Sequence, residues 1–166
     1  FIKEIANFNK EIILSTGMST ESEIKCALKL IKSQGFNMKK LTLLKCTSAY
    51  PTLPKEVNLN AMMTMKKKFQ VDVGLSDHTM GIEVSLAAVA LGAKIIEKHF
   101  TVNRNLPGPD QNSSLEPKEL KLLVKSIRNI ELALGDGKIK PTKSEINNIK
   151  IGRKSLIALK DIKKGD

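Results

Sequence analysis

The chain has 166 residues, 41% of them apolar, which is typical of a single globular domain with its own core. No run of about 18 apolar residues occurs, so the sequence predicts no membrane-spanning helix. The formal net charge is +11, but the chain has no Trp, one Tyr and three Arg. Side chains that stack on bases or read them are therefore scarce, and we interpret the charge as a solvated lysine surface, without nucleic-acid binding.

Strand-like and helix-like segments alternate along the chain. Strands are expected at residues 11–17, 40–47, 71–78 and 93–100. After each strand comes a segment that is expected to contain a helix. The expected helices cover residues 19–35, 57–69, 81–92 and 116–134. Thr20 and Glu23 have the spacing of a capping box, which predicts the start of the first of these helices.

Two segments fall outside this alternation. Residues 48–56 contain Pro51 and Pro54, and we expect a loop there because proline breaks a helix. Residues 139–166 have no place in the repeat, and we interpret them as a linker that leads to a further module.

Four successive strand–helix pairs predict βαβ units and a parallel sheet. Two architectures agree with this order, namely a doubly wound open sheet and one half of a (βα)8 barrel, which normally needs about 250 residues. In both, ligands bind where parallel strands end and helices begin.

The only two histidines, His78 and His99, occupy equivalent points at the ends of successive strands. Neighbouring parallel strands lie about 4.8 Å apart, so the two imidazoles are expected side by side. Alternation places Ser76 with His78, and Glu97 with His99, on one face. Two imidazoles at about 2.1 Å hold a divalent ion while leaving other positions open. The alternative is that each histidine is an ordinary hydrogen-bonded side chain.

Hydroxyl groups at the strand ends are candidate ligands for an anion beside helix N-termini. They belong to Ser15, Thr16, Thr47, Ser48 and Ser76. The alternative role is helix capping, for which Ser and Thr are also favoured. Asp110, in "PGPD", is a candidate site residue, and its alternative role is that of a turn residue.

A series of motifs resembles the sialic acid synthase family, which includes the N-acetylneuraminate, legionaminate and pseudaminate synthases. The motifs occur in this order: "ILSTGMS", "CTSAYPT", "NLNAM", "GLSDHTMGIEVSLAAVALGA", "IIEKHF", "PGPD", "SLEP" and "IRNIELALGDG". The resemblance implies an α/β fold in which four βα units form the second half of a (βα)8 TIM barrel. It assigns residues 1–138 to that half-barrel and residues 139–166 to a linker into a missing antifreeze-like domain.

The resemblance also implies a reaction. Phosphoenolpyruvate condenses with N-acetylmannosamine or a related N-acetylhexosamine, giving an N-acetylneuraminate-type sugar acid and phosphate. The implied cofactor is a divalent metal, Mn2+, held by His78 and His99. Ser15, Ser48 and Ser76 are expected to contact phosphoenolpyruvate. Tyr50 and Asp110 are expected to contact the sugar.

The resemblance places two further family groups upstream of Phe1, a glutamate that handles the water and a lysine that holds phosphoenolpyruvate. We therefore expect residues 1–166 alone to be inactive as a synthase. The full-length protein is expected to be a homodimer. With two cysteines and no signal peptide in "FIKEIANF", a cytoplasmic location is expected. The alternative function is a non-catalytic anion-binding βα module whose histidines are structural.

Overall fold

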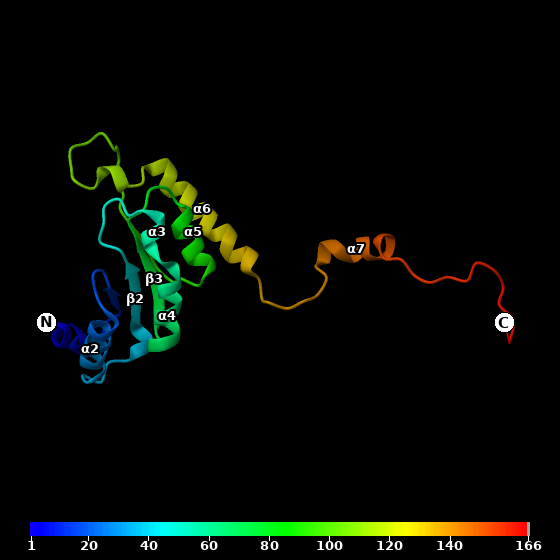
Figure 1. Cartoon of the computed structure of the whole chain (residues 1–166), viewed down its shortest axis with the longest axis horizontal. Coiled ribbons are helices and arrows are strands. Elements are labelled where there is room, and N and C mark those ends of the chain that lie inside the picture. The colour runs from blue at the N-terminus through cyan, green and yellow to red at the C-terminus, as the bar shows by residue number, and fades with distance from the viewer. Residues whose placement is uncertain (166) are drawn as a thin grey trace. The chain divides into compact units, whose positions relative to one another are not determined.

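The computed structural model describes residues 1–165, which divide into two units, Phe1–Leu134 and Gly135–Asp166. The first unit holds one four-stranded parallel sheet in the order β1-β2-β3-β4 (Figure 1). The strands are β1 (Ile12–Ser15), β2 (Leu41–Cys46), β3 (Asp72–Asp77) and β4 (Ile96–Lys98). Its α-helices are α1 (Ile2–Asn7), α2 (Glu21–Lys32), α3 (Pro54–Val57), α4 (Leu59–Phe69), α5 (Glu83–Ala90) and α6 (Pro117–Leu134).

The strand order decides between the two architectures. Each strand pairs only with its sequence neighbours, and the order never reverses. A doubly wound sheet needs such a reversal, where its helices change faces. Sequential parallel strands joined by right-handed crossovers keep their helices on one side and curve into a barrel. The chain therefore forms four βα units of a half-barrel, as predicted.

The two faces of the sheet have different surroundings. Ile12, Leu43 and Leu75 belong to the hydrophobic core between the sheet and its helices. On the opposite face Ile13 is 55% exposed, and Glu97 is exposed as well. In a closed barrel this second face is the interior.

Gly74 allows β3 and β4 to approach each other closely. A Cβ atom at this position would lie 2.4 Å from the carbonyl oxygen of Ile95 and 2.6 Å from Leu44 Cδ2. Such distances are far below van der Waals contact, so any other residue would push the two strands apart. The register of the strands that carry both histidines therefore depends on glycine at position 74.

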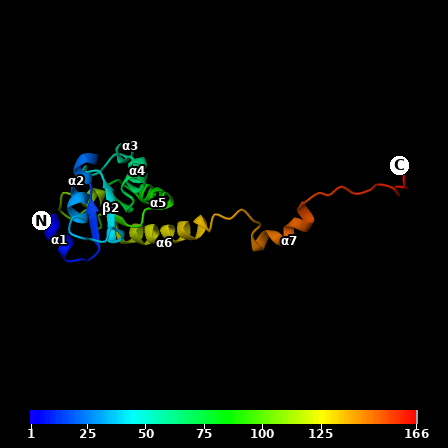
Figure 2. The same ribbon diagram turned by 90° about the horizontal axis from the view of Figure 1, so that it is seen from below.

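The helix boundaries confirm some sequence predictions and correct others. The capping box of Thr20 and Glu23 is present, with Thr20 N donating to the Glu23 carboxylate at 2.7 Å. The expected loop at 48–56 is wrong in its second half, because Pro54 is the first residue of α3. Proline is favoured there, since the first helical N–H has no partner within the helix. Helix α6 packs against α5 (Figure 2).

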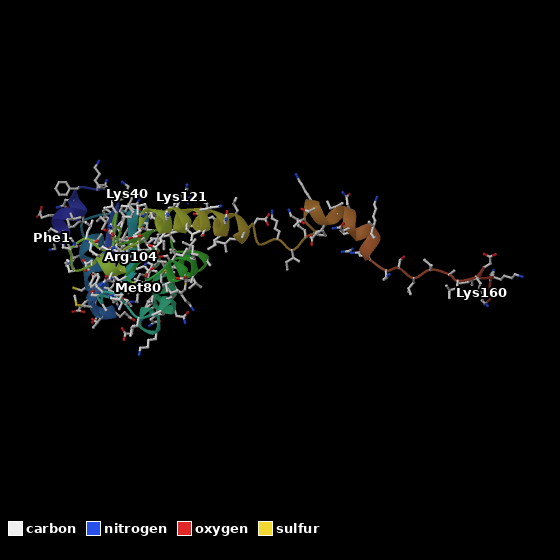
Figure 3. All side chains as sticks on the ribbon, turned by 90° about the horizontal axis from the view of Figure 1, so that it is seen from above. Phe1, Lys40, Met80, Arg104, Lys121 and Lys160 are labelled. Carbon is white, nitrogen blue, oxygen red and sulfur yellow. The ribbon has the colours of Figure 1, made fainter. Side chains whose placement is uncertain are left out.

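In the second unit, the described residues 135–165 form a single helix, α7 (Lys143–Gly152), in the segment expected to be a linker. Thr142 and Glu145 form its capping box, a signal that is visible in the sequence. Every described side chain of this unit is exposed except the half-buried Ile149, and Figure 3 shows them standing away from the ribbon. Among residues 1–165, no helix is both long and apolar enough to cross a membrane.

Candidate functional site

The ends of β3 and β4 bring the two histidines together. The ring centroids of His78 and His99 are 5.2 Å apart, with their planes at 85°. The ladder between the two strands ends at the pair Asp77 and Lys98, directly before both histidines. The sequence prediction that these imidazoles are neighbours is therefore confirmed.

The His78 ring is held by the loop after β2. Its Nδ1 lies 2.8 Å from the carbonyl oxygen of Thr47. A carbonyl only accepts, so in the neutral ring Nδ1 carries the proton and Nε2 keeps its lone pair. The backbone N–H of Thr52 donates to the His78 carbonyl oxygen at 2.9 Å. His78 is 6% exposed, and hydrogen bonds thus hold both its side chain and its backbone.

His99 faces a carboxylate. Its Nδ1 is 3.7 Å from Asp110 Oδ2, which is beyond hydrogen-bond distance, and its side chain is 31% exposed. The N–H of Leu115 donates to the His99 carbonyl oxygen at 2.8 Å. Asp110, which the resemblance assigns to the sugar, therefore lies on the Nδ1 side of the His99 ring.

The histidine pair fits a divalent ion in its donor chemistry. Metal-binding imidazoles usually direct their second nitrogen to a carbonyl or a carboxylate. Here Nδ1 of His78 contacts a carbonyl oxygen, and Nδ1 of His99 faces a carboxylate. Within residues 1–165, no three His, Cys, Asp or Glu side chains form a cluster able to hold a metal. An ion bound here would have two imidazole ligands from this chain and open positions for water and substrate.

Tyr50 lies over both imidazoles. Its ring centroid is 4.2 Å from that of His78 and 5.4 Å from that of His99, and the residue is 49% exposed. The phenol therefore forms part of the wall of the site, next to the two rings. This position agrees with the predicted contact to a substrate.

The hydroxyl groups at the strand ends divide into two sets. Thr16 Oγ1 donates to the Leu44 carbonyl oxygen at 2.8 Å, and Thr47 Oγ1 donates to that of Glu56 at 3.3 Å. These two threonines have structural roles. In the part of the chain that the structure describes, the hydroxyls of Ser15 and Ser48 make no hydrogen bond, so both remain available to a ligand.

Ser76 has a partner within the chain. Its hydroxyl donates to Glu97 Oε1 at 2.6 Å and lies 3.4 Å from His78 Nε2. Ser76 is buried, whereas Glu97 is exposed on the same face, as alternation predicts. Ser76 therefore connects a carboxylate to the imidazole pair, and an anion that bound here would compete with Glu97 for the hydroxyl proton.

Sequence reasoning missed a buried ion pair directly behind the histidines. Lys98 Nζ lies 3.0 Å from Asp77 Oδ2, with side chains 3% and 0% exposed, and donates to the Thr79 carbonyl oxygen at 2.7 Å. Asp77 also accepts from the Thr79 N–H at 2.9 Å and the Ser85 hydroxyl at 2.6 Å. The ion pair joins the end of β4 to the end of β3, and the hydrogen bond to Thr79 joins β4 to the loop after β3. Together they fix the spacing of the two histidines.

A second ion pair anchors the loop that carries Asp110. The Arg104 guanidinium donates to the Glu119 carboxylate at the start of α6 and, through Nε, to the Ser114 carbonyl oxygen at 3.0 Å. The hydrogen bond from Arg104 lowers the pKa of Glu119, and the same bond raises the pKa of Arg104. Both effects favour the charged forms that hold the loop in place.

Comparisons with known proteins point to one family. A model of the NeuB family matches residues 1–139. The N,N'-diacetyllegionaminic acid synthase of Campylobacter jejuni subsp. jejuni is 56% identical over 166 residues, which are 100% of this chain and 50% of that protein. The human N-acetylneuraminate-9-phosphate synthase is 37% identical over 171 residues, covering 99% of this chain and 45% of that protein.

A solved structure of a related synthetase resembles this chain in fold and sequence. The N-acetylneuraminic acid (sialic acid) synthetase of Leptospira borgpetersenii serovar Hardjo-bovis, in complex with citrate, superposes with a TM-score of 0.80 and 42% identity. The match covers 90% of this chain and 52% of that one. The chain thus spans about half the length of the curated relatives it matches.

Proposed function

Because the chain belongs to the NeuB family, we propose that it carries the metal-binding half of a nonulosonic acid synthase. The proposed reaction condenses phosphoenolpyruvate with N-acetylmannosamine or a related N-acetylhexosamine and releases phosphate. The observation that supports it best is the imidazole pair, whose Nδ1 atoms face Thr47 O and Asp110 Oδ2.

His78 and His99 would hold Mn2+, which when bound acts as a Lewis acid on the carbonyl oxygen of the open-chain sugar. Thr47 keeps the His78 lone pair on Nε2, and Asp110 lies on the Nδ1 side of the His99 ring. Tyr50 shields both rings from solvent on one side and offers its hydroxyl to the sugar. We assign the sugar contacts to Tyr50 and Asp110, as the resemblance implies.

The phosphate of phosphoenolpyruvate would bind to the strand-end hydroxyls. Ser15 and Ser48 are free to donate. Ser76 would donate to the phosphate once its hydrogen bond to Glu97 is broken. We further propose that the full-length protein works as a cytoplasmic homodimer.

Serine-to-alanine variants test the anion site in the full-length protein. Ser15→Ala and Ser76→Ala are expected to raise the KM for phosphoenolpyruvate roughly tenfold to 100-fold, with a smaller effect on the KM for the sugar. Each change removes a hydrogen bond to a charged group, worth about 1.5–3 kcal/mol. Steady-state kinetics with each substrate varied in turn measures the difference.

The matched control is Ser33→Ala, because Ser33 follows α2 and its hydroxyl donates only to the Leu30 carbonyl oxygen. This variant should leave both KM values unchanged. Equal increases in the KM for both substrates would show that Ser15 and Ser76 stabilise the fold without binding the anion.

The isolated 166-residue chain is expected to show no turnover and to associate. The sheet face that carries Ile13 and Glu97 is open to solvent, and β1 and β4 are both edge strands that recruit further chains. The family glutamate is expected to lie outside this segment, and the general acid–base catalysis that it would provide raises the rate by about 10²–10⁴-fold. A phosphate-release assay with Mn2+ and both substrates, run with light scattering, measures both properties.

Two results would contradict this expectation. A stable monomer would show that the open face needs no cover. Turnover that disappears in His78→Ala would show that a residue of this chain replaces the family glutamate, and Glu97 would be the first to test because Ser76 connects it to His78.

A further inference from the structure

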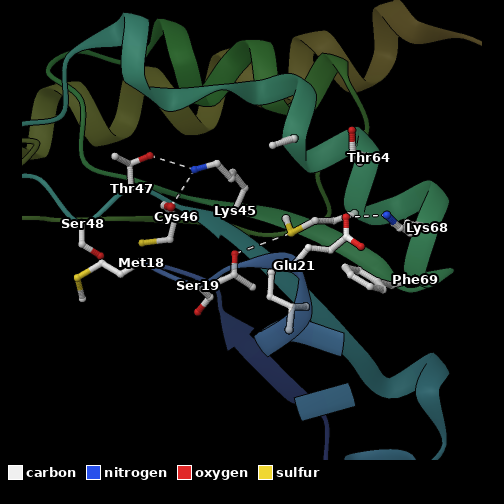
Figure 4. A pocket seen from close by; sticks show the side chains of 14 residues that line it. Met18, Ser19, Glu21, Lys45, Cys46, Thr47, Ser48, Thr64, Lys68 and Phe69 are labelled. Atoms are coloured by element: carbon white, nitrogen blue, oxygen red, sulfur yellow. Dashed lines mark hydrogen bonds and ion pairs between the residues drawn. The ribbon is translucent and has the colours of Figure 1, made fainter. Parts of the chain in front are cut away.

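A pocket of about 540 Å³ lies on the helix side of the sheet, between α2 and α4 (Figure 4). Neither histidine lines it, nor do Tyr50, Ser76 or Asp110. The pocket borders the histidine site through Thr47 and Ser48, which line it, and the Thr47 carbonyl oxygen contacts the His78 ring. Its size is within the range of about 300–1,000 Å³ that is usual for small-molecule sites.

The walls of the pocket are mostly apolar. Ile24 of α2 and Met65 of α4 are buried side chains that line it, and Phe69 lies at one end. The mouth is bridged by Lys68 and Glu21, whose side chains form an exposed ion pair at 2.6 Å. The charges of Lys68 and Glu21 are thus paired with each other.

Among the charged groups that line the pocket, the ammonium of Lys45, at the end of β2, is the one outside the Lys68–Glu21 ion pair. It is half-buried and donates to the Cys46 carbonyl oxygen at 2.8 Å and to Thr47 Oγ1 at 3.0 Å. An ammonium has three donors, and no ion pair within residues 1–165 includes Lys45. Partial burial lowers the pKa of Lys45, because desolvation disfavours its charged form.

Lys98 provides an internal comparison. Lys45 lies near the end of the central strand β2, and Lys98 is the last residue of the edge strand β4. Both side chains lie on the helix side of the sheet. Lys98 is paired with the buried carboxylate of Asp77 at 3.0 Å. Lys45 has only neutral oxygen partners. Because Lys45 is half-buried and has a third donor to offer, a ligand carboxylate would supply the counter-charge that Asp77 supplies to Lys98.

We propose that the pocket between α2 and α4 binds a small carboxylate with an apolar chain. The carboxylate accepts a hydrogen bond from Lys45 Nζ. The apolar chain runs along Ile24 and Met65 toward Phe69, and Figure 4 shows Lys45 toward one end of the pocket and Phe69 toward the other.

Octanoate is a suitable probe, with isothermal titration calorimetry on the full-length protein as the measurement. We expect saturable binding with a Kd on the order of 0.1–1 mM, typical of a ligand with about ten heavy atoms. n-Octanol, which has the same length without the charge, should bind at least about tenfold more weakly, since a charged hydrogen bond is stronger than a neutral one.

Variants assign the binding to the pocket. Lys45→Met should weaken octanoate binding about tenfold or more and leave octanol binding unchanged, whereas Lys45→Arg should keep octanoate binding. Thr64→Phe, an exposed position on α4 that lines the pocket, should weaken both ligands by filling the space. Lys94→Met is the matched control, because Lys94 is exposed and lies outside the pocket.

A second measurement follows the amine itself. Mass spectrometry should show that octanoate slows the reductive methylation of Lys45 and leaves that of Lys94 unchanged. No binding at 10 mM octanoate, which is about tenfold above the weakest Kd expected, would overturn the proposal. Equal binding by Lys45→Met or by octanol would also overturn it. Competition by phosphoenolpyruvate would place the probe at the histidine site and would equally contradict the proposal, without affecting the proposed function.

Discussion

Replacing Lys98 by methionine is expected to lower the free energy of unfolding by about 3–5 kcal/mol, the usual result of removing one partner of a buried ion pair. Methionine keeps the unbranched chain and removes the ammonium. The Asp77 carboxylate, fully buried, then keeps only the Thr79 and Ser85 donors. Urea unfolding of the full-length protein, with the m-value checked for constancy, measures the loss.

A double-mutant cycle separates the ion pair from the packing of the Lys98 side chain. The double variant Asp77→Asn/Lys98→Met leaves no unpaired charge, so its loss should be smaller than the sum of the two single losses. Lys125→Met, at an exposed position of α6, is the control and should change stability by no more than about 0.5 kcal/mol. A loss below about 1 kcal/mol for Lys98→Met would show that water or another group compensates Asp77.

Removing either imidazole is expected to abolish Mn2+ binding. In His78→Ala or His99→Ala one imidazole remains, and residues 1–165 provide no third ligand to complete a site. A single imidazole holds Mn2+ weakly, because the ion ranks lowest in affinity among the divalent metals of its row. Electron spin resonance of free Mn2+, titrated with the full-length protein, measures the bound fraction directly.

Asp110→Asn gives a graded control for the same experiment. Partners that orient a metal-binding imidazole typically contribute about 10–100-fold in affinity, so this variant should bind Mn2+ more weakly than the parent but more tightly than His99→Ala. Unchanged Mn2+ binding in both alanine variants would refute the metal site. It would favour the anion-binding module, in which the Thr47 contact makes His78 a structural residue.

The βα order was predictable because strand and helix periodicities are local properties of the sequence. The same alternation predicted that Ser76 and Glu97 share a face with the two histidines, and the hydrogen bond between Ser76 and Glu97 confirms it. Strand β4 is shorter than expected, since its ladder with β3 ends at Lys98 and His99 lies beyond it. The prediction of a loop at Pro54 is wrong because proline disrupts the interior of a helix but is favoured at its first position.

The features that sequence reasoning missed depend on register and on packing between elements. Asp77 and Lys98 form an ion pair only because β3 and β4 align them, and no local pattern states that alignment. The pocket beside Lys45 lies between α2 and α4, two helices that are far apart in the sequence and joined by the ion pair of Lys68 and Glu21. The Thr142 and Glu145 capping box, in contrast, was visible and predicts α7 without any tertiary information.

The fixation of His78 has a consequence for the entropy of ligand binding. Its ring is held by the Thr47 carbonyl oxygen, lies against Tyr50 and is buried, so its side-chain rotamer freedom is lost when the chain folds. His99 is more exposed, and its closest acceptor is 3.7 Å away, so it keeps more of that freedom. If the proposed metal site forms, an ion would meet His78 already in position, and most of the ordering cost of binding would fall on His99.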